Sequence, residues 1–368
     1  MGRGGVAVTL GVTFEKRLRD FTLSVDFAAE TGVTILFGES GSGKTTILRS
    51  VAGLTRPDAG RITIGDRVVF SAIDRLDEPP VRRRVAYVFQ HLALFPHLSA
   101  ADNIMYGLND VPLAERRART QAIATSFRIE SLLDRRPAEI SGGERQRVGL
   151  ARSLVTDPDV LLLDEPLSAL DHATQSRIIE DLLRWNDARR IPVLYVTHSQ
   201  REAFALGRRV LLLEDGRIVA DGAPEQVMHA PVHERVAELV GYENLLDAFV
   251  VTLRPDAGVM TVQVGGTRVQ VEAPIVGANV GDALRLAIRA GDIILATQRP
   301  SGLSARNIVA GTVSSMRRTG AFVSVHVGIG VDVEVHVTPS ACEELGLREG
   351  LDVWLVIKTH SCRAIAAI

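Results

Sequence analysis

The sequence predicts an α/β domain with a mostly parallel, covered sheet, followed by a second domain made of β-strands. Two patterns along the 368 residues lead to this prediction. Up to about residue 230, apolar runs alternate with helix-like segments such as 175–183, as in βα units. From about residue 245 the hydrophobic period becomes two, for example in 323–327 and 331–337, which is typical of half-buried strands.

The first functional motif follows the apolar run 33–37. Residues 38–45 match the pattern G-x-x-x-x-G-K-[ST], and a helix-like segment follows them. In such a loop the glycines let backbone N–H groups point at a phosphate, the lysine reaches the β- and γ-phosphates, and the threonine hydroxyl can bind Mg²⁺. We therefore predict a nucleotide site. Its predicted residues here are Gly38, Glu39, Ser40, Gly41, Ser42, Gly43, Lys44, Thr45 and Thr46.

A second motif is the run 160–163, which ends in Asp164 and Glu165. Buried parallel strands face ligands with their carboxyl ends. We predict that Asp164 lies near Mg²⁺. Glu165 points to the other side, where it can polarise the water that attacks the γ-phosphate. Acidic residues also follow strands as helix caps, so this pair does not identify the site by itself.

Two more strand-like runs end in a polar residue, 85–89 in Gln90 and 193–197 in His198. Singly, each is more often an ordinary surface or core residue. Between Gln90 and Asp164 lies Ser141-Gly142-Gly143-Glu144, which reads as a helix start with a capping box from the serine to the glutamate. A serine hydroxyl and bare glycine amides at a helix start also suit an anion.

Taken in order, these motifs resemble the ATP-binding subunit of an ABC transporter. The resemblance implies ATP and Mg²⁺ as ligands, with a phosphate loop, a Q-loop glutamine, a signature at 141–146, a D-loop at 168–171 and a switch histidine. It implies Glu165, His198 and Gln90 as catalytic residues. It implies Thr45, Gln90 and Asp164 as metal ligands. The further nucleotide contacts that it implies are Ser141, Gly142, Gly143, Glu144 and Asp171.

The resemblance also implies partners. In this family the two halves of a site come from opposite subunits, so a homodimer is expected. Integral membrane permease subunits and, indirectly, an extracytoplasmic solute-binding protein are expected too. A helical subdomain at about 91–158 would receive the permease near 91–96. Relatives stack adenine on an N-terminal aromatic, but Phe14 here fits a core position better, which leaves the stacking residue open.

Composition narrows the class of protein. The net charge of -2 gives no broad basic field for nucleic acid. The arginine run 82–84 is short and suits a solvated face. Two cysteines without metal-type spacing favour a reducing cytoplasm, and no apolar stretch of about 18 residues is present. We therefore expect a peripheral protein on the cytoplasmic face of the membrane, without a signal at Met1–Arg3.

The domain boundaries follow from turns and periodicity. A hairpin with an Asp-Gly turn over 210–219 closes the first domain, predicted as 1–230. A linker at 231–244 leads to a domain at 245–368. Within it, 281–289 and 350–358 look like a weak repeat, and such strands favour small barrels of the oligonucleotide/oligosaccharide-binding type.

The last part of the chain, about 303–368, resembles the molybdate-binding (Mop) unit at the end of molybdate importer ATPases, a unit related to TOBE domains. A tetrahedral dianion can be held by hydroxyls, backbone N–H groups and cations. The alternative is that these residues only cap turns or face solvent. The predicted oxyanion residues, for molybdate or tungstate, are Ser304, Arg306, Asn307, Lys358 and Ser361.

The sequence thus predicts the ATPase of an ABC importer for molybdate or tungstate, with a tail that senses the oxyanion or braces a dimer. One alternative is an importer for sulfate, a sugar, iron or a polyamine. Another is a soluble ABC ATPase that acts outside transport, although such proteins usually fuse two cassettes or insert a coiled coil. A third is a molybdate store, which the complete hydrolytic motif set disfavours.

Overall fold

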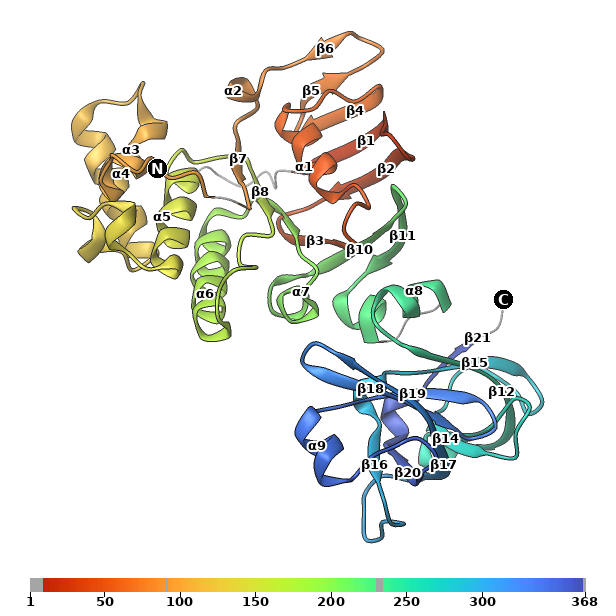
Figure 1. The fold of residues 1–368 in the computed structure, drawn as a ribbon. Coiled ribbons are helices and arrows are strands. Elements are labelled where there is room, and N and C mark those ends of the chain that lie inside the picture. Colours follow the sequence, from red (N-terminus) through yellow and green to blue (C-terminus); the bar gives the residue numbers. More distant parts are fainter. Residues whose placement is uncertain (1–8, 91, 230–233, 367–368) are drawn as a thin grey trace. The chain divides into compact units, whose positions relative to one another are not determined.

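The structure, a computed structural model, describes residues 9–90, 92–229 and 234–366. His91 of the expected permease groove, residues 231–233 of the expected linker, and Met1–Arg3 lie outside these ranges. The chain divides into two compact units, Met1–Val227 and Met228–Ile368 (Figure 1). The first is α/β and the second is built mainly of strands, so the predicted fold class is confirmed.

A six-stranded sheet forms the centre of the first unit. Its strands, in spatial order, are β11 (Arg217–Gly222), β10 (Arg209–Glu214), β3 (Gly32–Gly38), β9 (Pro192–Val196), β8 (Val160–Asp164) and β7 (Val85–Val88). All neighbours are parallel except β10 and β11, which form the predicted hairpin with Asp215 and Gly216 at positive φ. Every residue of β8 and β9 is buried, as expected for covered parallel strands.

The first unit also contains an antiparallel sheet that the sequence analysis did not predict. Its strands, in spatial order, are β2 (Thr22–Ala29), β1 (Leu10–Arg17), β4 (Ala59–Ile64), β5 (Arg67–Ser71) and β6 (Leu76–Asp77). It shares one apolar core with the parallel sheet, in which Leu10 and Leu162 both take part. Phe14 lies in this core and is 2% exposed, as its reading as a core residue predicted.

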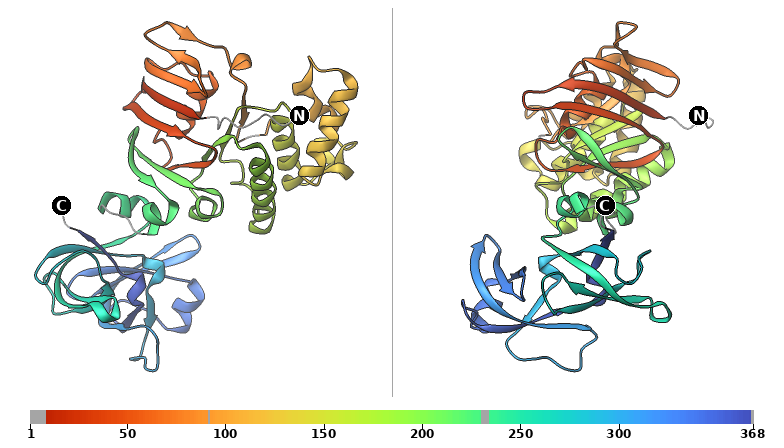
Figure 2. Two further views of the ribbon diagram at one scale, coloured as in Figure 1. Left: turned by 180° about the vertical axis from the view of Figure 1, so that it is seen from behind. Right: turned by 90° about the vertical axis from the view of Figure 1, so that its right-hand side faces the viewer.

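Helices complete the first unit. They are α1 (Lys44–Ala52), α2 (Pro80–Arg83), α3 (Ala100–Met105), η1 (Tyr106–Leu108), α4 (Leu113–Ser126), η2 (Glu130–Leu132), η3 (Pro137–Glu139), α5 (Gly142–Leu154), α6 (His172–Arg189) and α7 (Gln200–Leu206). No strand is described between residues 92 and 159. Figure 1 and the left view of Figure 2 show α3, α4 and α5 grouped together, beside the parallel sheet.

One arginine of the run 82–84 is not on the solvated face that the sequence suggested. The side chain of Arg83 is fully buried. Its Nη1 donates to the carbonyl oxygens of Ser50 and Val51, at 2.8 and 2.9 Å, and its Nη2 donates to Asp77 at 2.7 Å. Arg83 therefore satisfies carbonyls at the C-terminal end of α1, which is a favourable place for a cation. The correction concerns Arg83 alone, because Arg82 is exposed.

The second unit contains two five-stranded sheets. The first, in spatial order, is β14 (Gln270–Pro274), β13 (Val259–Val264), β12 (Asn244–Arg254), β15 (Ala283–Ile288) and β21 (Arg363–Ala366). The second is β16 (Ile294–Ala296), β20 (Asp352–Ile357), β17 (Asn307–Thr319), β18 (Phe322–Gly328) and β19 (Asp332–Val337). The remaining elements are η4 (Glu225–His229), α8 (Glu234–Leu239), η5 (Pro255–Ala257), η6 (Ala290–Asp292), α9 (Pro339–Glu344) and η7 (Thr359–Ser361).

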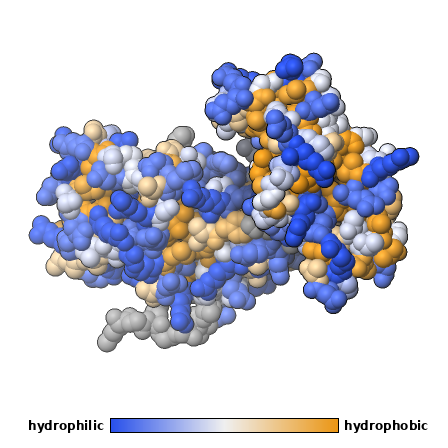
Figure 3. Space-filling model, turned by 90° about the horizontal axis from the view of Figure 1, so that it is seen from below, coloured by the Kyte–Doolittle hydropathy of each residue, from blue (hydrophilic) through white to orange (hydrophobic). Residues whose placement is uncertain are grey.

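Two details of this unit differ from the sequence interpretation. The stretch 231–244, expected to be a linker, contains the helix α8. The alternating stretch 262–271 is not one strand, because a turn at Gly265 and Gly266 divides it into β13 and β14. The large exposed apolar residues of this unit include Ile294 and Val280, and Figure 3 shows hydrophobic residues interspersed with hydrophilic ones on the face drawn.

The two halves of the second unit exchange strands. After β15 the chain passes through η6 into β16, which pairs with β20 of the other sheet. After β20 it passes through η7 into β21, which pairs with β15. The repeat seen in the sequence is therefore a structural repeat whose halves are interlocked. The Mop-like stretch 303–368 is not self-contained, because its last strand belongs to the first sheet.

Two asparagines hold the halves together in equivalent ways. The amide of Asn244, at the start of β12, bonds both backbone groups of Glu334 in β19, at 2.8 and 2.7 Å. The amide of Asn307, at the start of β17, bonds both backbone groups of Glu272 in β14, at 2.9 and 2.6 Å. Each asparagine is 4% exposed, so each pair of bonds is protected from water.

We expect Asn244→Ala and Asn307→Ala to destabilise the second unit by similar amounts, roughly 1–3 kcal/mol each, because each leaves two backbone groups without a partner. The measurement is hydrogen exchange, read by mass spectrometry, of the most slowly exchanging amides of β12 to β20. The control is Arg268→Ala, since Arg268 is exposed. Unchanged protection in either asparagine variant would contradict the prediction.

Candidate nucleotide site

The phosphate loop joins β3 to α1. Gly38, Gly41 and Gly43 have φ of 150°, 90° and 107°, a region that other residues rarely adopt. A Cβ at Gly38 would lie 2.2 Å from the carbonyl oxygen of Leu213, so this position requires glycine. Gly43 is the N-cap of α1 and has no side chain to cap the first turn. The helix start is therefore free to receive an anion on its backbone amides.

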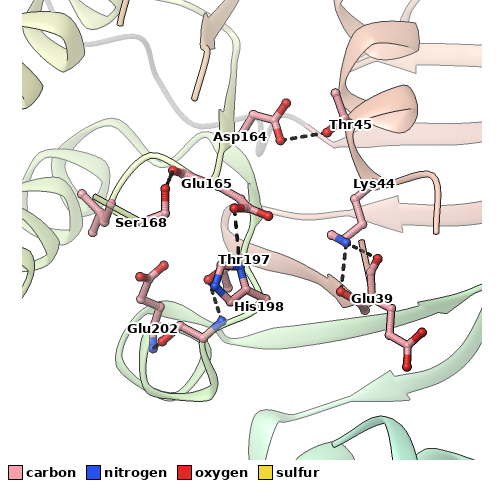
Figure 4. A network of polar contacts seen from close by, with 12 residues as sticks. Glu39, Lys44, Thr45, Asp164, Glu165, Ser168, Thr197, His198 and Glu202 are labelled. Carbon is pink, nitrogen blue, oxygen red and sulfur yellow. Dashed lines mark hydrogen bonds and ion pairs between the residues drawn. The ribbon is translucent and has the colours of Figure 1, made fainter. Parts of the chain in front are cut away.

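Lys44 folds back over this loop. Its Nζ donates to the carbonyl oxygens of Gly38 and Glu39 at 2.9 and 2.7 Å, as the dashed lines in Figure 4 show. The residue is 6% exposed, and desolvation lowers the pKa of its ammonium group although Glu165 and Asp164 act in the opposite direction. A buried cation held by two carbonyl oxygens and, at 3.5 Å, by the Ser42 hydroxyl is ready to exchange these neutral partners for a phosphate.

Asp164 is held at both carboxylate oxygens. Thr45 Oγ1 donates to Oδ1 at 3.1 Å, and the hydroxyl of Tyr87 donates to Oδ2 at 2.9 Å. Desolvation, and then the Asp164 charge, raise the pKa of Tyr87, so its hydroxyl keeps its proton and acts as a donor. Sequence reasoning missed Tyr87, although it lies in the strand that precedes Gln90.

The residues present fit a magnesium ion. Two oxygens bound to one octahedral Mg²⁺ lie about 3 Å apart, which matches the 3.1 Å between Thr45 Oγ1 and Asp164 Oδ1. Among the described residues, no group of three His, Cys, Asp or Glu side chains could hold a metal ion. Such a site suits Mg²⁺ with a nucleotide, because phosphate oxygens and water supply the remaining ligands. Gln90 lies two residues beyond β7 and is exposed.

Glu165 occupies a sharp turn directly after β8. Its φ is 45°, which is uncommon for a residue with a side chain. Its N–H donates to the Val196 carbonyl at 3.1 Å, and Ser168 Oγ donates to its carbonyl oxygen at 3.1 Å. Its carboxylate lies 3.4 Å from Nδ1 of His198. In Figure 4, Asp164 points toward Thr45 and Glu165 points toward His198.

A small cavity lies beside Glu165. Its volume is about 190 Å³, enough for a few waters at about 30 Å³ each. The lining residues are Glu165, Ser168, His172, Gln175, Thr197, His198, Ser199 and Glu202. Water can therefore reach the carboxylate from this side.

The signature segment starts α5, as predicted. Ser141 is the N-cap, its Oγ accepts from the N–H of Glu144 at 3.3 Å, and the Glu144 carboxylate accepts from the N–H of Ser141 at 2.7 Å. The backbone hydrogen bond from Ser141 lowers the pKa of Glu144. A Cβ at Gly143 would lie 2.4 Å from the Thr174 side chain, so the glycine lets α5 approach α6 closely. At Gly142 a Cβ would meet only ordinary contacts.

Asp171 caps the neighbouring helix, α6. Its carboxylate accepts from the N–H groups of Ala173 and Thr174, at 3.1 and 3.0 Å. The Thr174 side chain, and then these N–H groups, lower the pKa of Asp171 by hydrogen bonding. Within the described ranges, no hydrogen bond or ion pair joins the signature Ser141–Glu144 to the phosphate loop. The site of one chain thus brings together the loop, Asp164, Glu165 and His198, but not the signature.

Buried charges join α5 and α6 farther along. The carboxylate of Asp181 on α6 is buried and faces Arg147 of α5 at 3.7 Å, Arg128 at 3.2 Å and Arg184 at 3.3 Å. A cavity of about 600 Å³ lies beside it, between α4 and α6. None of the predicted nucleotide residues lines this cavity.

The predicted oxyanion residues divide into two groups. Asn307 is committed to the Glu272 backbone and lies 3.5 Å from Sγ of Cys362, so its amide has no donor left for an anion. Arg306 and Lys358 are exposed, and each is the residue next to the end pair Asn307–Ile357 of the β17–β20 ladder. Two basic residues therefore follow the same end of this ladder.

The other two predicted oxyanion residues flank this end of the ladder. Ser304 lies two residues before Arg306 and is exposed. Ser361 is half-buried and ends η7, and its N–H donates to the Lys358 carbonyl at 3.0 Å.

The equivalent ladder end of the first half has opposite charges. There the positions next to the pair Asn244–Ile288 are Glu243 and Arg289. The Glu243 carboxylate accepts from the N–H of Ala290 at 2.8 Å, and Arg289 lies over the Tyr242 ring at 4.7 Å. The first half therefore has one acid and one base next to its asparagine pair, whereas the second half has two bases, with the Glu272 carboxylate bonded to the Thr359 hydroxyl nearby.

Within the described residues, no helix combines the length and the apolar character of a membrane span.

Comparison with known proteins finds a matching family model for each of the two units. The model of the ABC transporter family matches residues 22–168, and that of the TOBE domain matches residues 303–364. A molybdenum import ATP-binding protein ModC of Rhizobium meliloti is 40% identical over 353 residues, covering 95% of this chain and 98% of its own. A ModC of Mesorhizobium japonicum is 38% identical over 362 residues, covering 96% of each.

Among solved structures, cbiO1 from Clostridium perfringens, part of the ABC transporter complex cbiONQ, is similar with a TM-score of 0.53. It is 26% identical, and the match covers 59% of this chain and 89% of that chain. The chain therefore belongs to the family of ABC transporter ATP-binding proteins that includes these molybdenum import proteins.

Proposed function

We propose that this chain is the ATP-hydrolysing subunit of an importer for molybdate or tungstate, working at the cytoplasmic face of the membrane with permease subunits and an extracytoplasmic binding protein. The observation that carries the proposal is that relatives named for molybdenum import match almost the whole chain, the C-terminal unit included. An importer for another solute would share the nucleotide site, but it would not need the two basic residues at the end of the β17–β20 ladder.

The geometry supports a division of roles within the site. Lys44 and the amides at the start of α1 hold the β- and γ-phosphates. Thr45, Asp164 and Gln90 hold the metal ion, which neutralises phosphate charge when it is bound. Glu165 accepts a proton from the attacking water, which approaches from the side of the small cavity. His198, 3.4 Å from Glu165, keeps this carboxylate directed toward the water.

The working unit in this proposal is a homodimer with two shared ATP sites. The signature of one chain does not contact its own phosphate loop, yet it offers the Ser141 hydroxyl and two glycine amides for an anion. A second chain placed head to tail would bring its signature to the γ-phosphate held by Lys44. Asp171 would lie at the same junction, because it starts the helix against which α5 packs.

The C-terminal unit is proposed to bind the oxyanion through Arg306 and Lys358, assisted by the hydroxyls of Ser304 and Ser361. Two like charges at neighbouring positions repel each other, and a dianion between them relieves this repulsion. Binding would stop import only if the anion favours separated ATPase units over closed ones, since equal affinity for both shifts nothing.

We expect Glu165→Gln to retain ATP binding and to lose turnover by a factor of roughly 10² or more, because the general base is removed. The variant should accumulate as an ATP-bound dimer, seen by light scattering with Mg-ATP. His198→Ala should behave similarly in turnover. The control is Glu180→Gln, an exposed position of α6. Near-normal hydrolysis by Glu165→Gln would assign the base elsewhere, and a monomer with Mg-ATP would contradict the shared site.

We expect Lys44→Ala to lose nucleotide binding, because the only described side-chain cation within the loop is removed from a buried position. Binding of a fluorescent ATP analogue is the measurement, with circular dichroism to verify folding. Lys16→Ala removes a lysine paired with Asp58 outside the loop, and it should bind as the unmodified chain does. The expected loss of binding free energy is that of one charge-assisted hydrogen bond, about 1.5–3 kcal/mol. An affinity of Lys44→Ala for ATP within about threefold of normal would refute this role.

We expect molybdate and tungstate to bind the full chain more tightly than phosphate, and the double variant Arg306→Ala, Lys358→Ala to abolish this binding in isothermal titration. Arg317→Ala with Arg318→Ala is the matched control, because it removes two exposed arginines from the other end of β17. The proposed oxyanion site is wrong if binding persists in the first double variant or is absent from the unmodified chain. The C-terminal unit would then have only a structural role, stabilising the dimer.

A further inference from the structure

Tyr87 contacts the nucleotide site at Asp164, although it belongs to none of the motifs in the sequence. It is the third residue of β7, and alternation along the strand places it on the same side as Phe89. The two rings pack with centroids 4.3 Å apart. From this position its hydroxyl reaches Asp164 on the neighbouring strand β8, at 2.9 Å.

The hydroxyl donates its proton to Asp164 Oδ2. The other oxygen of Asp164 accepts from Thr45, in the first turn of α1. These two bonds connect Asp164 on β8 to the neighbouring strand β7 and to α1. Rotation of the Asp164 carboxylate would break two of its bonds at once.

We propose that Tyr87 is a positioning residue for the metal ion: its hydroxyl fixes Asp164 so that Oδ1 faces Thr45 at the place where Mg²⁺ binds. The proposal rests on the proposed role of Asp164 as a metal ligand. It assigns Tyr87 no contact with the nucleotide. Residues that orient metal ligands in this way typically change metal affinity about 10- to 100-fold when they are lost.

The competing view is that Tyr87 only packs in the interior. The variant Tyr87→Phe separates the two, because it keeps the ring against Phe89 and removes only the hydroxyl. A packing role predicts little change in any ligand affinity. A positioning role predicts a loss of metal affinity, with the affinity for metal-free nucleotide preserved, since Lys44 and the phosphate loop are untouched.

The test uses the purified full chain and Mn²⁺, which can replace Mg²⁺ and is visible by electron paramagnetic resonance. Free Mn²⁺ is titrated in the presence of ADP, and ADP binding is measured separately in EDTA. We expect Tyr87→Phe to bind Mn²⁺ about 10-fold more weakly in the ADP complex. Its ADP affinity in EDTA should stay within about twofold of normal, since no contact with the phosphates is removed.

A matched control is Tyr195→Phe. Tyr195 lies on β9, on the other side of β8 from Tyr87, and its hydroxyl donates to a carboxylate at 2.8 Å, but that carboxylate belongs to Glu202. This variant should bind Mn²⁺ normally, even if it lowers stability. Equal Mn²⁺ affinity in Tyr87→Phe and the unmodified chain overturns the proposal, and so does a parallel loss of metal-free ADP binding.

Asp164→Asn distinguishes failure of this proposal from failure of the proposed site. If Asp164→Asn weakens Mn²⁺ binding and Tyr87→Phe does not, the metal site stands and the role of Tyr87 is wrong. If neither variant changes Mn²⁺ affinity, Asp164 is not a metal ligand, and both proposals are wrong.

Discussion

The turn at Glu165 is the constraint on which the nucleotide site depends. Because its φ is 45°, two consecutive carboxylates leave the end of β8 toward different partners. Asp164 faces Thr45 and Tyr87, and Glu165 faces His198. A non-glycine residue in this region costs about 1–3 kcal/mol, which the surrounding structure must offset. The bonds at both ends of this residue, from its N–H and to its carbonyl, are the contacts that hold it.

The helices α5 and α6 start near the end of β8, and their contact with each other also shapes the site. Asp171 starts α6 a few residues beyond Glu165, and Ser141 starts α5 beside it. Gly143 lets the two helix starts touch, and the buried Asp181 ties α6 to Arg147 of α5. Removing Arg147 would leave the buried Asp181 with only its two more exposed arginine neighbours, so the contact between α5 and α6 depends on this charge as well as on Gly143.

Local patterns could be predicted from the sequence, and long-range pairings could not. The loop at 38–45, the strand end at Asp164 and the capping box at Ser141 each depend on neighbours within a few residues, and the structure has all three. Tyr87 and Arg83 were missed because their partners lie 77 and about 33 residues away. Nothing in their own neighbourhood distinguishes them from an ordinary strand tyrosine or a surface arginine.

The topology of the second unit could likewise not be predicted from local sequence patterns. The repeat was visible as two similar stretches, but the exchange of β16 and β21 between sheets depends on pairings that no local pattern encodes. The exchange explains why Asn307 has a structural role, although it lies next to Arg306. Its amide bonds the backbone of the opposite half, as the amide of Asn244 does in the equivalent position.

The two halves differ in the charges next to these equivalent asparagines. Packing between the halves accounts for the equivalent geometry at Asn244 and Asn307, since both bond the backbone of the opposite half. It does not account for a neutral pair, Glu243 and Arg289, in one half and two cations, Arg306 and Lys358, in the other. One acid and one base follow the ladder end in the first half and two bases follow it in the second, and this difference is the basis for proposing a dianion as the ligand of the second half.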